Sequence, residues 1–385
     1  MSQSESQEKE NIWNKILAKS TTRNKTKDAN ILVLGDKRSG KEALMNAVQK
    51  LNPNTKKMKL VHEGKARSSR PKNQANMIDY TFYSVMDPED DSVELGKINL
   101  WFLEETLHSK EILDVMLKKE VFSNFMVLVV LDLEEYWKLS SKLTKWIEFI
   151  NTEIVPRFCN KLSLTEGDLQ RSKLKDRVLS FMEPETTPEG RTVNSKPHIG
   201  MENSLNLPNG VLESNPGFPI GLSMNNAEHI IEIRKQSSGD RILEMIEYTL
   251  RKTAVTYAAS LFYTSIKMET NINVLGDYLN HLLLEMPFIY PSNTRKDQVF
   301  IPTGYDNLDL INQIYSRIVN KAFESVVAAP LNRLSKRKLR KVVVQDNQAF
   351  LREINQRLNP QNRNLAAPRF NAERAARILN LLQND

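Results

Sequence analysis

Cysteine is nearly absent from this sequence. A single residue, Cys159, occurs in the 385-residue chain. One thiol cannot build an internal disulfide framework, and such sparing use of cysteine fits a reducing compartment. The fold must therefore be held by a hydrophobic core, and a chain with 40% apolar residues can bury a substantial one.

Long apolar runs and a strong excess of one charge are also missing. No apolar stretch reaches the ~18–20 residues that a membrane-spanning helix needs, and the polar segment 1–19 lacks the pattern of a signal peptide. The net charge of +7 is moderate and arises from local runs. We therefore expect a cytosolic protein without a membrane span, and we do not expect nucleic-acid binding as its general role.

The patterns of common catalytic and metal sites are absent as well. No G-x-S-x-G motif and no paired cysteine and histidine occur. The five histidines are scattered without the spacing of metal ligands: His62, His108, His198, His229 and His281. We expect no metal site, no catalytic residue and no enzymatic activity.

One stretch does carry a chemical pattern. The apolar segment 30–34 runs into G-x-x-x-x-G-K and then into a helix whose apolar residues share one face. A strand, a glycine-rich loop and a helix in this order are typical of a phosphate-binding loop, in which backbone amides and the lysine contact phosphates. The candidate nucleotide-binding residues are Gly35, Asp36, Lys37, Arg38, Ser39, Gly40, Lys41 and Glu42.

Glu42 stands where a working loop has Ser or Thr to bind Mg²⁺. A carboxylate about 5 Å from a phosphate costs roughly 3 kcal/mol at an effective dielectric constant near 20, which outweighs the ~0.3–1 kcal/mol gained at a helix N-terminus. The loop is therefore interpreted as degenerate: it keeps the backbone turn of a phosphate-binding loop but does not hydrolyse nucleotide. Two alternatives remain open: nucleotide binding without hydrolysis, and an active GTPase or ATPase in which Glu42 itself binds Mg²⁺.

Strands and helices alternate along most of the chain, which predicts an α/β fold with a mainly parallel sheet, of the P-loop GTPase-like or Ras-like type. The continuous apolar run 125–131 is typical of a central parallel strand. The other expected strands are 30–34, 78–85, 97–103, 218–222 and 258–264. The expected helices are one directly after the glycine-rich loop, with Leu44, Ala47, Val48 and Leu51 on one face, and 137–158, 164–182, 240–254 and 272–284.

The later GTPase signatures have drifted. The strand 97–103 is followed by Glu104-Glu105-Thr106-Leu107, which lacks the glycine that senses the γ-phosphate. Asn225-Asn226-Ala227-Glu228 replaces the guanine-reading N-K-x-D, whereas Thr264-Ser265-Ile266-Lys267 still resembles the last GTPase loop. Loss of these signatures with retention of the strand and helix pattern indicates a scaffold.

The domain plan follows from composition shifts. Basic runs at 56–72 and 333–341 are interpreted as solvated segments, with an acidic protein surface as the alternative for both. A nuclear signal or a microtubule contact is a further alternative for 333–341. The expected regions are 1–10 disordered, 11–29 an N-terminal helix and connector, 30–318 the GTPase-like domain with a disordered insertion at 184–216, 319–358 a basic and helical extension, 359–371 a linker, and 372–383 a short amphipathic helix.

The last segment is predicted to bind a partner. Asn371 is a suitable N-cap, and one stripe of the helix carries Ala375, Ile378, Leu379 and Leu382. A helix this short is marginal alone, so it should fold in a partner's groove. The alternative is that the same stripe packs back on the domain.

Several residue groups together form a family pattern. They are Asn11-Ile12-Trp13 with Ile16-Leu17, Tyr263–Lys267 with Asn271-Ile272, Phe288 and Tyr290, and, most specifically, V-F-I-P-T-G-Y-D-N at 299–307. Over residues 10–358 the chain resembles the light intermediate chain of cytoplasmic dynein, of the dynein-1 type.

This resemblance implies a non-catalytic subunit located in the cytoplasm and on the microtubule cytoskeleton. In that family the GTPase-like domain grips the dynein heavy chain, and a C-terminal helix binds cargo adaptors. The implied partners are the heavy chain, cargo adaptor proteins, other dynein subunits and, indirectly, microtubules. No cofactor is expected, apart from the open possibility of a structurally bound nucleotide.

Overall fold

The computed structural model describes residues 27–52, 55–56, 78–88, 94–104, 109–182, 185–186, 192–193, 207–288, 290, 292–294 and 298–329. Several predictions concern residues outside these ranges. They are the N-terminal disorder and helix at 1–26, nearly all of the basic run 56–72, the whole extension from 330 to 358, the linker 359–371, and the partner-binding helix with Ala375, Ile378, Leu379 and Leu382.

An eight-stranded sheet organises the described residues, in the order β10-β9-β8-β5-β1-β4-β3-β2. Strands β4, β1, β5, β8 and β9 are parallel, and β2, β3 and β10 pair with their neighbours antiparallel. The bounds are β1 Lys27–Leu34, β2 Thr55–Lys56, β3 Ile78–Met86, β4 Glu94–Leu103, β5 Phe125–Asp132, β8 Ile220–Asn225, β9 Ser260–Tyr263 and β10 Phe300–Ile301. This confirms the predicted GTPase-like α/β fold.

The central strands are buried because both of their faces are apolar. In β1, Ile31 and Val33 belong to one core cluster and Leu32 and Leu34 to the other. Every residue of β5 is buried, as its unbroken apolar run predicted. β1 begins at Lys27, three residues before the expected start, because even its exposed first residues pair with Gly96 and Lys97 of β4.

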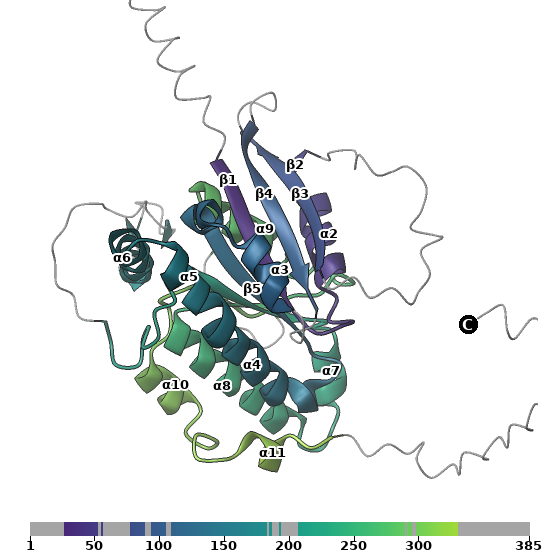
Figure 1. Cartoon of the computed structure of the whole chain (residues 1–385). Helices are drawn as coiled ribbons and strands as arrows, with labels where there is room; N and C mark the ends of the chain where they lie inside the picture. Colours follow the sequence, from purple (N-terminus) through teal and green to yellow (C-terminus); the bar gives the residue numbers. More distant parts are fainter. Residues whose placement is uncertain are drawn as a thin grey trace, which may run out of the picture. The chain divides into compact units, whose positions relative to one another are not determined.

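Helices cover both faces of the sheet (Figure 1). On one face, α2 (Lys41–Leu51) and α9 (Ile272–Leu284) pack against each other and against the sheet. On the other face lie α3 (Ser109–Met116), α4 (Leu139–Phe149), α5 (Val155–Lys161), α6 (Leu164–Met182), α7 (His229–Arg234), α8 (Gly239–Tyr257), α10 (Leu308–Ile314) and α11 (Phe323–Val326).

The long helix expected at 137–158 is interrupted. A 3-10 turn (Tyr136–Lys138) precedes α4, and a π-helical turn (Ile150–Ile154) separates α4 from α5. Pro156 stands in the first turn of α5, where its missing N–H and its ring cannot continue an α-helical ladder. The apolar period is nevertheless maintained, because Trp146, Ile150 and Phe158 are all fully buried.

Within the insertion predicted to be disordered at 184–216, the structure describes residues 185–186, 192–193 and 207–216. β6 (Glu185–Thr186) and β7 (Thr192–Val193) pair antiparallel. Residues 207–216 lie against the end of α8, with the amides of Leu212 and Ser214 donating to the carbonyls of Val255 and Thr256. The prediction was wrong here because it weighed composition, whereas Val211 and Leu212 are buried and the backbone finds partners.

The motif at 299–307 has a structural role. Phe300 stacks on Phe262 at the sheet edge, and the Asn307 side chain caps α10 by accepting from the Leu310 amide at 2.8 Å. Arg251 of α8 donates two hydrogen bonds to Asp306, at 2.7 and 2.6 Å, and both side chains are 3% exposed. The core continues through Phe323 and Val327, past the boundary expected at residue 318.

Candidate functional site

The loop between β1 and α2 has the backbone shape that its sequence predicts. The Ser39 amide donates to the Asp36 carbonyl at 3.1 Å, and Gly40 adopts a left-handed conformation (φ 78°) immediately before α2. Gly35 has no space for a side chain, since an added Cβ would lie 2.6 Å from Ser39 Oγ and 2.7 Å from the Val130 carbonyl oxygen. Both glycines of the motif are therefore required by the turn itself.

Lys41, the residue that would contact phosphates, is already paired. Its Nζ lies 2.8 Å from Glu104 Oε1 and 3.5 Å from the Asp36 carbonyl oxygen, and its side chain is 3% exposed. Glu104 directly follows β4, where a GTPase has the aspartate that reaches Mg²⁺ through water. The charge of Lys41 is thus balanced by a carboxylate of the chain itself.

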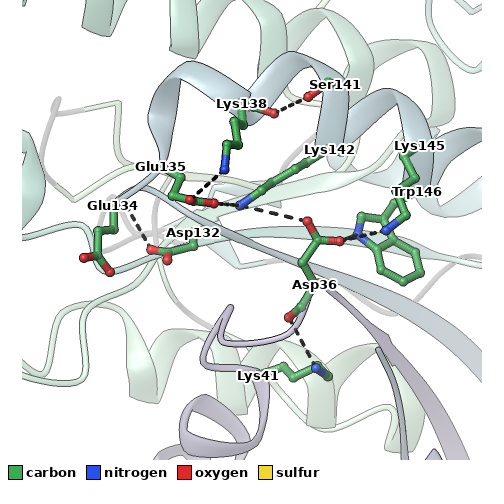
Figure 2. A network of polar contacts seen from close by, with 10 residues as sticks. All are labelled: Asp36, Lys41, Asp132, Glu134, Glu135, Lys138, Ser141, Lys142, Lys145 and Trp146. Atoms are coloured by element: carbon green, nitrogen blue, oxygen red, sulfur yellow. Dashed lines mark hydrogen bonds and ion pairs between the residues drawn. The ribbon is translucent and has the colours of Figure 1, made fainter. Parts of the chain in front are cut away.

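Asp36 fastens the loop to α4 (Figure 2). Its Oδ1 accepts from Trp146 Nε1 at 3.2 Å and from Lys145 Nζ at 3.1 Å, while Oδ2 lies 3.9 Å from Lys142 Nζ. Trp146 is fully buried, and Lys145 lies over its ring at 4.8 Å from the centroid. Asp36, the first residue between the two glycines of the motif, therefore connects the loop to α4.

The same network continues into the loop after β5 (Figure 2). Glu135 accepts from Lys138 Nζ at 2.8 Å and from Lys142 Nζ at 2.7 Å. These two hydrogen bonds lower the pKa of Glu135 to about 2. The lysines of α4 near the loop are consequently engaged with carboxylates of the chain.

Two asparagines after one another in the chain have different partners: Asn225 contacts the loop, and Asn226 contacts the end of β5. Asn225, at the end of β8, donates from Nδ2 to the Ser39 carbonyl at 3.1 Å and is 1% exposed. Its amide group lies so close to Gly40 that a side chain there would collide with it. Asn226 donates to Asp132 Oδ1 at 2.8 Å. Although the N-K-x-D signature has drifted, its first asparagine holds the loop in position.

Glu228, which replaces the guanine-reading aspartate, is also engaged. Its Oε2 accepts from Ser265 Oγ at 2.5 Å, and its Oε1 lies 3.1 Å from Lys267 Nζ. Burial by itself raises the pKa of Glu228, but these two contacts outweigh it and lower the pKa below its usual value. Both carboxylate oxygens therefore have partners within the chain.

The predicted site residues divide into three groups. Gly35, Gly40 and Ser39 form the turn, and Ser39 Oγ has no hydrogen-bond partner among the described residues. Asp36 and Lys41 are paired internally. Lys37, Arg38 and Glu42 are exposed to solvent, with Glu42 in the first turn of α2. The structure thus assembles the turn of a phosphate-binding loop, in which Asp36 and Lys41 contact residues outside the loop and the other three charged residues are exposed.

Sequence reasoning missed the contacts of Trp146, Lys145 and Asn225. Trp146 was expected as an apolar residue of a helix, and nothing local connects it to Asp36, 110 positions away. Asn225 did carry a signal, because it occupies the first position of the drifted N-K-x-D signature at the end of a strand. In this structure the asparagine at that position contacts the Ser39 carbonyl of the loop.

The described residues contain neither a cluster of metal ligands nor a membrane-spanning helix. No group of three or more His, Cys, Asp or Glu side chains there could hold a metal ion. None of the helices in that part of the chain is long and apolar enough to cross a membrane.

Comparison with known sequences identifies related proteins. The family model of the dynein light intermediate chain matches residues 7–379. Cytoplasmic dynein 1 light intermediate chain 1 of Mus musculus is 24% identical over 91% of this chain and 65% of its own length. Its counterpart in Dictyostelium discoideum is 25% identical over 92% of this chain and 75% of its own. The chain therefore spans less than two thirds of the mouse relative.

Comparison with solved structures agrees in fold. The crystal structure of the conserved domain of a dynein light intermediate chain superposes with a TM-score of 0.53 and 18% sequence identity, over 75% of this chain and 86% of that one. The GTPase-like architecture described above is shared with that domain.

Proposed function

The chain belongs to the dynein light intermediate chain family, and on that premise we propose that it is a non-catalytic subunit of a cytoplasmic dynein motor. In this role the GTPase-like domain docks on the motor's heavy chain, and the C-terminal segment recruits cargo adaptors. The protein then works in the cytoplasm, associated with microtubules through the motor.

One observation about the site supports the non-catalytic role. The residues at the positions that contact phosphate and base in a GTPase are engaged with other side chains: Lys41 with Glu104, and Glu228 with Ser265 and Lys267. Binding of a nucleotide through these positions would compete with those contacts. A loop held in this way is suited to shaping the domain.

Co-purification tests the docking proposal. The full chain, carrying an affinity tag, is expressed in cells of its own organism and recovered, and the recovered proteins are identified by mass spectrometry. A dynein heavy chain is expected in near-stoichiometric amount. Its absence, with the tagged chain folded and soluble, would overturn the proposed role.

A second candidate function is that of a nucleotide-binding protein of the small-GTPase type. It is favoured by the preserved shape of the loop, where Gly35, Gly40 and Asn225 maintain the turn that cradles phosphates. The purified protein is heat-denatured, and the supernatant is run on an anion-exchange column. Stoichiometric GTP, GDP, ATP or ADP would establish this candidate, whereas the scaffold role predicts no released nucleotide.

A further inference from the structure

The register of the sheet places Glu104 beside the phosphate-binding loop. Leu103, the last residue of β4, pairs with Leu34, the last residue of the parallel strand β1. Gly35 and Glu104 therefore leave the sheet at the same edge and in adjacent positions. This is why a residue 63 positions away from Lys41 reaches its ammonium group.

The position of the Glu104 carboxylate matters for any phosphate ligand. In a working loop the lysine extends along the loop to the β- and γ-phosphates. Here the nearest anion to Lys41 Nζ is Glu104 Oε1, at 2.8 Å, and the lysine side chain has almost no exposed surface. A phosphate oxygen approaching this buried ammonium would meet the Glu104 carboxylate and would have to displace it or bear its repulsion.

The neighbouring groups compensate only in part for the loss of Lys41. Lys37 and Arg38 are exposed cations of the loop, but Glu42 adds a negative charge in the first turn of α2. The carboxylate of Asp36 faces α4, and Lys142 and Lys145 are engaged there. The backbone amides and the partial positive charge at the start of α2 remain, but they act beside two glutamates.

We propose that Glu104 is the residue that excludes phosphate-bearing ligands from the loop, because its carboxylate takes the place of a phosphate oxygen on Lys41. The inference rests on the non-catalytic role proposed above and names the residue responsible for it. Removing the charge of Glu104 should therefore create a phosphate site.

Calorimetric titration of the full chain with inorganic pyrophosphate tests this directly, since pyrophosphate presents phosphate groups without a base. Glu104→Gln is compared with the wild type and with Glu134→Gln, a matched control that removes a carboxylate from an exposed position after β5. We expect Glu104→Gln to bind about tenfold more tightly than the wild type, or better. The control should bind as the wild type does.

Equal affinities of the wild type and Glu104→Gln, including no binding by either, would overturn the proposal. A gain that survives Lys41→Met in the Glu104→Gln background would also overturn it, because the pyrophosphate would then lie elsewhere. If Glu104→Gln does not fold, Glu104→Asp is used in its place, because it withdraws the carboxylate by one methylene and should still bind pyrophosphate more tightly than the wild type. An affinity of Glu104→Asp equal to that of the wild type would then overturn the proposal.

The outcome is separable from the proposed function. Glu104→Gln should still recover the dynein heavy chain as the wild type does. Failure to bind pyrophosphate with normal heavy-chain recovery would reject the role of Glu104 alone. If the wild type itself does not recover a dynein heavy chain, the subunit role is rejected, whatever the pyrophosphate result.

Discussion

At the scale of single residues, Arg251 and Asp306 form a buried ion pair, with both side chains 3% exposed. Burial lowers the pKa of Arg251, but the hydrogen bonds and the charge of Asp306 outweigh it and raise the pKa above its ordinary value. Arg251 also donates to the Tyr315 hydroxyl at 3.1 Å. One guanidinium therefore connects α8, the loop of the 299–307 motif and the residue after α10.

Removing that guanidinium should be strongly destabilising. Arg251→Met leaves the Asp306 carboxylate buried without its partner, which typically costs about 3–5 kcal/mol. Denaturant unfolding of the purified protein would measure the loss. Arg241→Met, at an exposed position of the same helix, is the matched control and should change the unfolding free energy by less than about 0.5 kcal/mol. Similar losses in both variants would contradict the assignment.

Glu135 should contribute stability that depends on pH. Its pKa in the folded protein is about 2, below its ordinary value of 4.5, because Lys138 and Lys142 bind the charged form. A lowered carboxyl pKa gives stability that is fully present above the unfolded pKa and is lost as the pH falls through the folded one. The side chain is 38% exposed, so the contribution should be small.

Comparison of the wild type with Glu135→Gln isolates this effect. The wild type should be more stable above pH ~4.5, and the difference should shrink as the pH approaches about 2. Unfolding free energies measured across this range test the expectation. A difference that stays constant with pH would show that the two lysines do not favour the charged form of Glu135.

At the scale of elements, α10 depends on its first residue. The Asn307 side chain accepts from the Leu310 amide and so satisfies one of the free N–H groups of the helix. Asn307→Ala should cost about 1 kcal/mol of unfolding free energy. Asn307→Asp retains an acceptor and should be close to the wild type, and Gln313→Ala, at an exposed position of the same helix, should be neutral.

The loop and α4 are coupled as elements as well. The carboxylate of Asp36 bridges the two, and Asn225 holds the loop from β8. Contacts from two sides therefore support the left-handed Gly40 and the tight turn of the loop.

At the scale of the whole molecule, the proposed subunit has two separable activities. Ile378→Asp combined with Leu382→Asp places charges on the stripe predicted to enter an adaptor's groove, and should abolish adaptor binding. Heavy-chain recovery should be unchanged, because the proposed docking uses the GTPase-like domain. Parallel affinity captures from the same lysate measure both. Adaptor binding that persists in the double variant would remove the predicted role of this segment.

Most of the domain's architecture was predictable from local pattern. Central strands such as β5 and helices such as α9 were predicted from apolar runs and apolar periodicity, which involve only residues close together in the sequence. The ordered residues at 207–216 were not predictable in this way, because their composition is that of a loop and their partners are backbone groups at the end of α8. The pairing of Asp306 with Arg251 likewise joins residues 55 positions apart.

The sequence by itself determined the phosphate-binding turn and the alternation of strands and helices, since both depend on residues near one another in the chain. Only the tertiary structure decided what became of the loop's charges. Lys41 meets Glu104 because two parallel strands end in register, and Asp36 meets Trp146 because α4 packs over the same edge of the sheet. Electrostatic interactions depend on distance in space, and distances between remote residues are set by packing and register.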